Sequence, residues 1–193
     1  MNRRDALRKI AVGGAAAIAT PLWVEALAEA AEQHAAHHQA ARTAVGAWTP
    51  KVLSPAQNET VVTIAELIIP QTDTAGATKA RVNEFIDSVL TEAAPADKQK
   101  FLDGLAWIDA RSTKDIGAPF VKATPAQQTA LLTTLSAKTP SADDKPGADF
   151  FTAIKALTVT GYYTSEIGMR EEMGDTGVMF FTEYKGCTHP EHH

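Results

Sequence analysis

Two short stretches that have the same sequence signal for the start of a helix constrain the fold most. Residues 54–57 and 124–127 read Ser-Pro-Ala-Gln and Thr-Pro-Ala-Gln. In each, the hydroxyl can cap a helix, proline fits the first turn, and glutamine can complete a capping box. An apolar face follows the first stretch as far as Ile69, and Pro70 then stops the helix. We therefore expect residues 54–69 to form the central buried helix.

The same reasoning extends along the chain and predicts an all-α fold. Apolar residues recur at helical spacing in residues 79–92, 95–111 and 148–163, and also after the second capping stretch. Phe120 is expected to anchor the turn at residues 117–120, and the chain from about residue 165 is expected to be irregular. We predict a compact bundle of about five to six helices with an N-terminal signal and alanine-rich helix and a long irregular C-terminal tail.

The N-terminus has the composition of a secretory signal. Arg3 and Arg4 precede Leu7 and a weakly apolar run from Ile10 to Leu22. The paired arginines favour the twin-arginine export route, and small residues at Ala26 and Ala28 suggest cleavage after Ala28. A membrane anchor is the competing interpretation, but the stretch from Ile10 to Val24 has only 15 residues, fewer than the roughly 20 that a spanning helix needs, and Pro21 interrupts it. An uncleaved signal also stays open.

These features predict three segments. Residues 1–28 would be the twin-arginine signal peptide, and residues 29–52 an alanine-rich helical linker. Residues 53–193 would be the helical domain, with an irregular tail from about 165. Because the apolar face of residues 23–44 is mostly alanine, we expect that helix to pack weakly and to be mobile or dependent on a partner.

Charge and cysteine content narrow the choice of partners. The 193 residues carry 18 Lys and Arg against 23 Asp and Glu, a formal net charge of −5. No basic patch is present, so nucleic acid and anionic lipid are poor partners. The single cysteine, Cys187, excludes an internal disulfide.

The chain lacks the motifs of a catalyst. It contains no Gly-x-Gly-x-x-Gly for a dinucleotide, no Cys-x-x-Cys-His for haem and no Gly-x-Ser-x-Gly nucleophile. We therefore predict no catalytic, cofactor-binding or metal-binding residues, and a helper role.

Several strings, taken in order, carry a family resemblance. They are residues 53–57 leading to 64–70, then 71–74 with Gly76, 85–87, 101–105, 117–120 and 161–168. Together they resemble the gluconate 2-dehydrogenase subunit 3 family. The resemblance implies a small, cofactor-free subunit of a periplasmic or membrane-attached dehydrogenase acting on a sugar or sugar acid.

The resemblance also implies the partners. The large subunit would be an FAD-dependent flavoprotein of the glucose-methanol-choline oxidoreductase type, and a multi-haem cytochrome c could accept its electrons. The small subunit would supply the signal read by the twin-arginine translocase, so that the two chains cross together in the folded state. The complex would then lie in the periplasm, associated with the membrane.

Two groups of residues are candidates for the contact with such a partner. Tyr162 and Tyr163, with Ser165 and Glu166, lie at a predicted helix end, and tyrosine is enriched at interfaces. One of these tyrosines could equally belong to the core of this chain. Three aromatic residues in the tail would bury against the partner or fold back on the bundle: Phe180, Phe181 and Tyr184.

Two further clusters leave alternatives open. Cys187 could form a disulfide with the flavoprotein, stay a free thiol, or bind a metal together with His189. His34, His37 and His38 share one helix face, which suits either a metal site or a solvated surface. The alternative function is therefore a stand-alone exported metal-binding protein that uses one of these clusters.

Overall fold

The structure, a computed structural model, describes residues 20–38 and 48–175. Within these ranges the chain is helical and has no strand, which confirms the predicted all-α bundle. The long helices are α2 (Leu22–His38), α3 (Pro55–Ile68), α4 (Val82–Glu92), α5 (Pro95–Ile116), α6 (Pro125–Leu135) and α7 (Lys145–Tyr163). Two short elements, η1 (Phe120–Lys122) and η2 (Gly168–Glu172, a π-helix turn), complete it.

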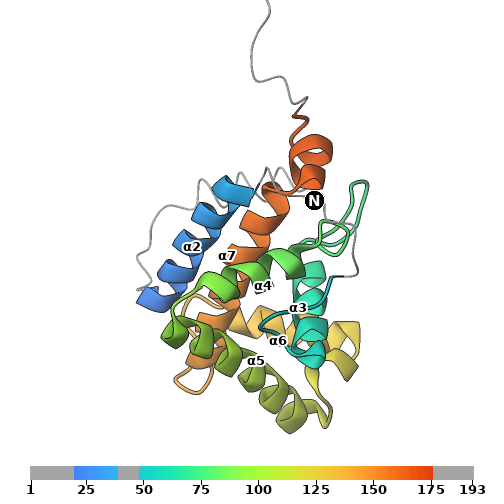
Figure 1. Ribbon diagram of the computed structural model, residues 1–193. Coiled ribbons are helices and arrows are strands. Elements are labelled where there is room, and N and C mark those ends of the chain that lie inside the picture. Colours follow the sequence, from blue (N-terminus) through green and yellow to red (C-terminus); the bar gives the residue numbers. More distant parts are fainter. Residues whose placement is uncertain (1–19, 39–47, 176–193) are drawn as a thin grey trace, which may run out of the picture.

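Helix α7 is the centre of the bundle, a place that the sequence pattern assigned to α3. It packs against α2, α3, α4, α5 and α6, which surround it in Figure 1. Four of its apolar side chains, Phe150, Phe151, Ile154 and Leu157, are buried. Helix α3 also buries Val61 and Ile64, but on a face directed mainly at α4 and α7. The longer, more completely surrounded helix therefore organises the core.

Both predicted capping boxes are present. At the start of α3, the backbone N–H of Gln57 donates to the Ser54 hydroxyl at 3.3 Å, and that of Ser54 donates to the Gln57 side chain at 2.9 Å. Thr124 and Gln127 repeat this arrangement at α6. Phe120, in η1, is fully buried, as predicted from its turn, and η1 packs against α3 and α5.

Helix boundaries differ from the sequence expectation at several ends. Helix α5 continues past Arg111 to Ile116 and ends at Gly117, whose φ of 84° provides a left-handed C-cap. The apolar stripe fades there, but backbone hydrogen bonds and a polar i, i+4 pair continue the helix. Helix α4 begins at Val82, because Arg81 adopts a left-handed conformation with φ of 57°. Helix α7 begins three residues earlier than expected, at Lys145.

Helix α2 is part of the core, contrary to the expectation of weak packing. Val24, Leu27 and Ala31 are exposed by 2%, 1% and 0%. In Figure 1, α2 lies beside α7, the helix with which it makes its most extensive contact. Small alanine side chains let two helices approach closely. The burial of α2 therefore results from its contact with α7 and not from a strongly apolar face of its own. The helix also runs across the predicted boundary at residue 28.

Two glycines allow aromatic rings to lie against helix backbones. A Cβ atom at Gly104 of α5 would overlap the ring of Phe150 on α7. A Cβ atom at Gly161 of α7 would lie 2.6 Å from the ring of Phe85 on α4. At both points the missing side chain sets the distance between neighbouring helices, and the ring fills the space.

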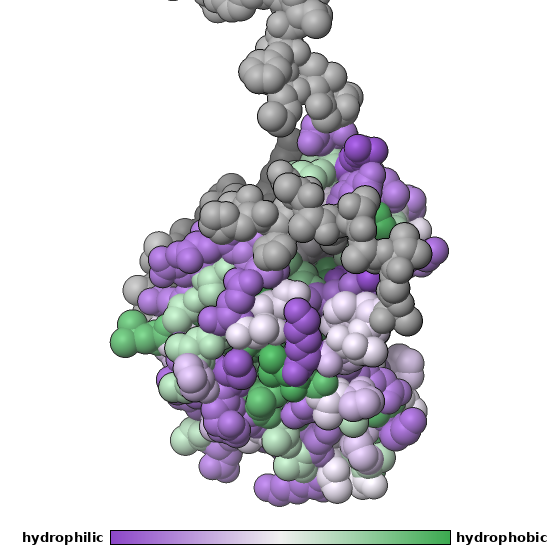
Figure 2. Space-filling model, in the orientation of Figure 1, coloured by the Kyte–Doolittle hydropathy of each residue, from purple (hydrophilic) through white to green (hydrophobic). Residues whose placement is uncertain are grey.

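Few large apolar side chains are exposed on the described body. On the face shown in Figure 2, apolar residues form small separate patches among polar ones. In the part of the chain that the structure describes, the large apolar side chains with high exposure are Leu22 (83%) and Met173 (55%). None of the described helices is both long enough and apolar enough to cross a membrane.

Candidate functional site

Two segments that are far apart in the sequence meet at one end of the bundle. They are the loop after α3, residues 70–76, and the end of α7 with the turn that follows it, residues 162–175. Figure 1 shows both at the same end of the molecule. The Tyr162 hydroxyl donates to the Ala75 carbonyl at 2.7 Å, and the Thr74 hydroxyl donates to the Glu172 carboxylate at 2.7 Å. We call these two segments together the loop–turn surface.

Glu66 holds the loop side of this surface in place. Its carboxylate accepts hydrogen bonds from the backbone N–H groups of Gln71 at 2.8 Å and Thr78 at 2.9 Å. Gly76 lies against this carboxylate so closely that a Cβ atom there would lie 2.6 Å from the Gln71 nitrogen. A charged acceptor with two backbone donors fixes the loop strongly, so its exposed residues are presented in a defined conformation.

Ser165 organises the turn side. Its hydroxyl donates to the Tyr162 carbonyl at 2.6 Å and accepts from the backbone N–H of Gly168 at 3.0 Å. This arrangement ends α7 and redirects the chain into η2. Ser165 is only 2% exposed, so its side chain acts inside the chain.

The four residues proposed at this helix end divide into two pairs. Tyr162 is fully buried, so, like Ser165, it offers no side-chain surface to a partner. The buried residues of α7 continue from Leu157 and Thr158 to Gly161 and Tyr162. The helical spacing of this buried stripe is a signal that the sequence contained. Tyr163 is half-buried and its ring meets that of Tyr162 edge to face at 5.2 Å. Glu166 is exposed and pairs with Arg170 at 3.0 Å.

A second carboxylate, that of the buried Asp87 in α4, binds the segment before α3. Its oxygens accept from the backbone N–H groups of three successive residues, Lys51 at 2.7 Å, Val52 at 3.0 Å and Leu53 at 2.9 Å. Asp87 is 1% exposed, so these bonds form largely away from water. In the sequence, Asp87 is marked only as part of the string 85–87, and its position within the apolar stripe of a helix is the signal of its burial.

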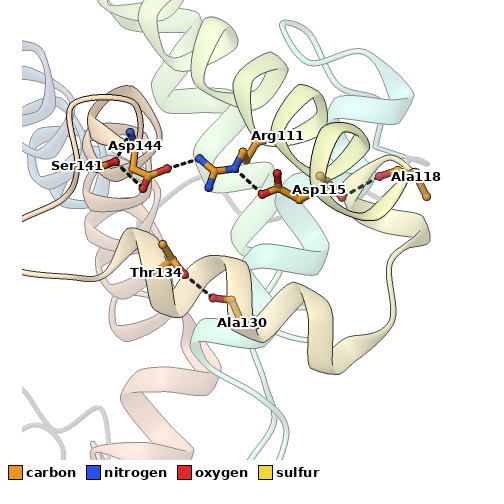
Figure 3. A network of polar contacts seen from close by, with 8 residues as sticks. Arg111, Asp115, Ala118, Ala130, Thr134, Ser141 and Asp144 are labelled. Carbon is orange, nitrogen blue, oxygen red and sulfur yellow. Dashed lines mark hydrogen bonds and ion pairs between the residues drawn. The ribbon is translucent and has the colours of Figure 1, made fainter.

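A polar network joins α5 to the start of α7 (Figure 3). Arg111 donates to Asp115 one turn along its own helix and to Asp144 just before α7. Asp144 also accepts from the Ser141 hydroxyl at 2.7 Å. The Ser141 hydroxyl and then the Arg111 guanidinium hold the pKa of Asp144 below its ordinary value of 3.8. Hydrogen bonds to Asp115 and Asp144 raise the pKa of Arg111.

His34 lies inside the contact between α2 and α4. Its Nδ1 is 3.1 Å from a Glu92 oxygen, and its ring meets that of Phe85 edge to face at 5.6 Å. The residue is only 6% exposed, so it belongs neither to a solvated surface nor to an open metal site. The side chains of His37 and His38 lie outside the described part. The residues that the structure describes include no group of three side chains suited to holding a metal ion.

A depression lies between the end of α6 and the first turns of α7. It has a volume of about 450 Å³, and its lining includes Lys138, Lys145 and Lys155 together with Asp149. Lys145 is paired with Asp149 at 2.8 Å. A shallower hollow of about 240 Å³ adjoins it near Phe151.

The remaining predicted residues stand outside the described ranges. They are the export residues Arg3, Arg4 and Leu7, the tail residues Phe180, Phe181 and Tyr184, and the candidate pair Cys187 and His189. Ala26 and Ala28, the predicted cleavage residues, are described and lie within α2.

Comparison with known proteins gives one positive result. The gluconate 2-dehydrogenase subunit 3 family matches residues 55–178, from the start of α3 to just beyond η2. No curated protein and no solved structure matches the chain. The match includes the loop–turn surface and more than half of the sequence, so this chain belongs to the gluconate 2-dehydrogenase subunit 3 family.

Proposed function

We propose that this chain is the non-catalytic small subunit of an FAD-dependent dehydrogenase that oxidises a sugar or sugar acid. The observation that carries the proposal is the family match over residues 55–178, which spans five of the long helices and both short elements. Family membership associates the chain with a dehydrogenase catalytic subunit as an accessory subunit. The flavin would lie in the large subunit, of the glucose-methanol-choline oxidoreductase type, and haem c in a cytochrome subunit.

The second part of the proposal concerns export. A flavoprotein has to acquire its cofactor before export, so a signal for the twin-arginine route suits a folded pair of chains. Arg3 and Arg4 would address the complex to the translocase, and the complex would act in the periplasm, associated with the membrane. This chain would thus provide the export signal and stabilise the flavoprotein.

The loop–turn surface is the proposed docking site for the flavoprotein. Met173 is exposed there, and Tyr163 and Ile167 are half-buried beside it. Methionine and tyrosine supply adaptable and rigid contact area, respectively, at protein interfaces. The tail that carries Phe180, Phe181 and Tyr184 continues directly from this surface in the sequence. A disulfide from Cys187 to the flavoprotein would add a covalent link in the periplasm.

Co-expression with the product of the neighbouring open reading frame tests the proposal. Affinity capture of the small subunit should recover a yellow complex with the absorbance of bound FAD. Recovery of a colourless monomer would contradict it. A variant with both Arg3→Lys and Arg4→Lys should keep the complex but leave it in the cytoplasm, which separates the export role from the assembly role.

Docking can be tested separately with matched variants. Met173→Asp and Tyr163→Ala should each weaken capture of the flavoprotein, on the order of tenfold or more for an interface anchor. Leu22→Asp is the control, because Leu22 is also an exposed apolar residue but lies at the start of α2. Equal capture by all three variants would rule out the loop–turn surface as the docking site.

A further inference from the structure

The predicted cleavage site lies in the middle of a core helix. The bond between Ala28 and Glu29 falls within α2, which spans Leu22–His38 without interruption. Four buried side chains form one stripe along this helix, at spacings of three, four and three residues: Val24, Leu27, Ala31 and His34. A cut after Ala28 would remove the first two of them.

The removed residues would leave a gap against the rest of the protein. Val24 and Leu27 are exposed by 2% and 1% and belong to the main hydrophobic core. Trp23 also packs against this core. Among the side chains that the structure describes, the remaining ten residues of α2 would keep Ala31 and His34 buried and Ala30 partly buried, and a helix of that length is marginal without strong packing. Helix α7, the centre of the bundle, would lose part of its largest helix–helix contact.

We propose that α2 is a permanent part of the folded protein and that the export leader ends before Leu22. Residues 1–21 contain the paired arginines and an apolar run from Ile10 to Ala19. Ala17 and Ala19 form the same small-x-small pattern that Ala26 and Ala28 display, so a cut at the Ala19–Thr20 bond would leave α2 intact. The leader is therefore joined to the body through a helix whose buried stripe is in place only when the bundle has formed.

The stability of the full-length chain tests whether α2 belongs to the body, independently of export. Leu27→Ala should lower the Tm by roughly 5–15 °C, because it removes a fully buried leucine side chain from a domain of this size. Leu22→Ala is the matched control, since Leu22 is 83% exposed on the same helix, and should leave the Tm within about 2 °C. No difference between the two variants would overturn the proposal.

The N-terminus of the exported protein tests the processing claim, which rests on the proposed export. Intact mass measurement of the periplasmic chain, in complex with its flavoprotein, should give a first residue no later than Leu22, including an uncut Met1. A first residue at Glu29, or anywhere after Leu22, would overturn the proposal. If no chain reaches the periplasm, the proposed export fails, while the comparison of Leu27→Ala with Leu22→Ala still decides the place of α2.

Discussion

The hydroxyl of Tyr162 donates a hydrogen bond of 2.7 Å to the carbonyl of Ala75, a residue 87 positions earlier in the chain. The tyrosine is fully buried at the end of the central helix, and the acceptor belongs to the loop after α3. This bond joins the string at residues 161–168 to the loop that contains the string at residues 71–74. Together with the Thr74–Glu172 bond, it connects the two segments of the loop–turn surface.

Tyr162→Phe should destabilise the protein by about 1 kcal/mol, since it leaves the Ala75 carbonyl without this donor but keeps the ring. The free energy of unfolding from urea titration measures the loss. Tyr163→Phe is the matched control on the neighbouring, half-buried tyrosine and should have a smaller effect. Tyr162→Phe leaves the proposed interface side chains in place, so capture of the flavoprotein by this variant should remain unchanged. Loss of capture by Tyr162→Phe alone would contradict the assignment of Tyr162 to the core.

Asp87→Ala should destabilise the protein by about 3 kcal/mol or more. Three backbone N–H groups, those of Lys51, Val52 and Leu53, would lose a charged acceptor at a buried site. Chemical denaturation measures this change. Asp143→Ala, which removes an exposed carboxylate, should stay within about 0.5 kcal/mol of the parent protein. Comparable losses in both variants would show that the Asp87 bonds contribute little.

Thr158→Val should stabilise the protein by up to about 1 kcal/mol. The Thr158 hydroxyl is fully buried and has no hydrogen-bond partner among the described residues, whereas valine has nearly the same shape and no polar atom. Thr152→Val on the same helix is the opposite case, because the Thr152 hydroxyl donates to the Ala148 carbonyl at 2.9 Å. A higher Tm for Thr158→Val, and not for Thr152→Val, is the expected pair of results.

Asp144→Asn should make the stability of the protein fall less steeply as the pH is lowered. Since the folded-state pKa of Asp144 is lowered, its contribution is present above the unfolded-state pKa, near 3.8, and is lost as the pH falls through the folded-state value. Thermal unfolding between about pH 5 and pH 2 should therefore show a steeper decline for the parent protein than for Asp144→Asn. Asp143→Asn should follow the parent curve, and identical slopes in all three proteins would contradict the role of the Arg111–Asp144–Ser141 network.

The elements that could be predicted from sequence depend on local interactions. The capping boxes at Ser54 and Thr124 need only four adjacent residues, and the apolar stripes of α4, α5 and α7 need only one helix each. The end of α5 was predicted too early because the apolar stripe stops before the helix does. Gly117, the residue that ends it, was assigned to the next turn instead.

The features that could not be predicted depend on how the helices meet. The alanine-rich α2 is buried because α7 faces it, and nothing in its own composition reveals that neighbour. The adjacent residues Tyr162 and Tyr163 look equivalent in the sequence, and only the register of α7 decides that the first is buried. The contacts of Asp87 with residues 51–53 and of Arg111 with Asp144 span more than thirty positions, so no local pattern contains them.

The rings that rest on Gly104 and Gly161 have an evolutionary consequence. At each point, a backbone without a side chain and a large ring on the opposite helix share one fixed volume. Substituting alanine for the glycine alone would push the two helices apart, and replacing the ring alone by a small residue would open a void. Relatives that lack either the glycine or the ring should therefore differ at both positions. A larger residue in place of the glycine should accompany a smaller residue in place of the ring, so that the spacing between the helices stays the same.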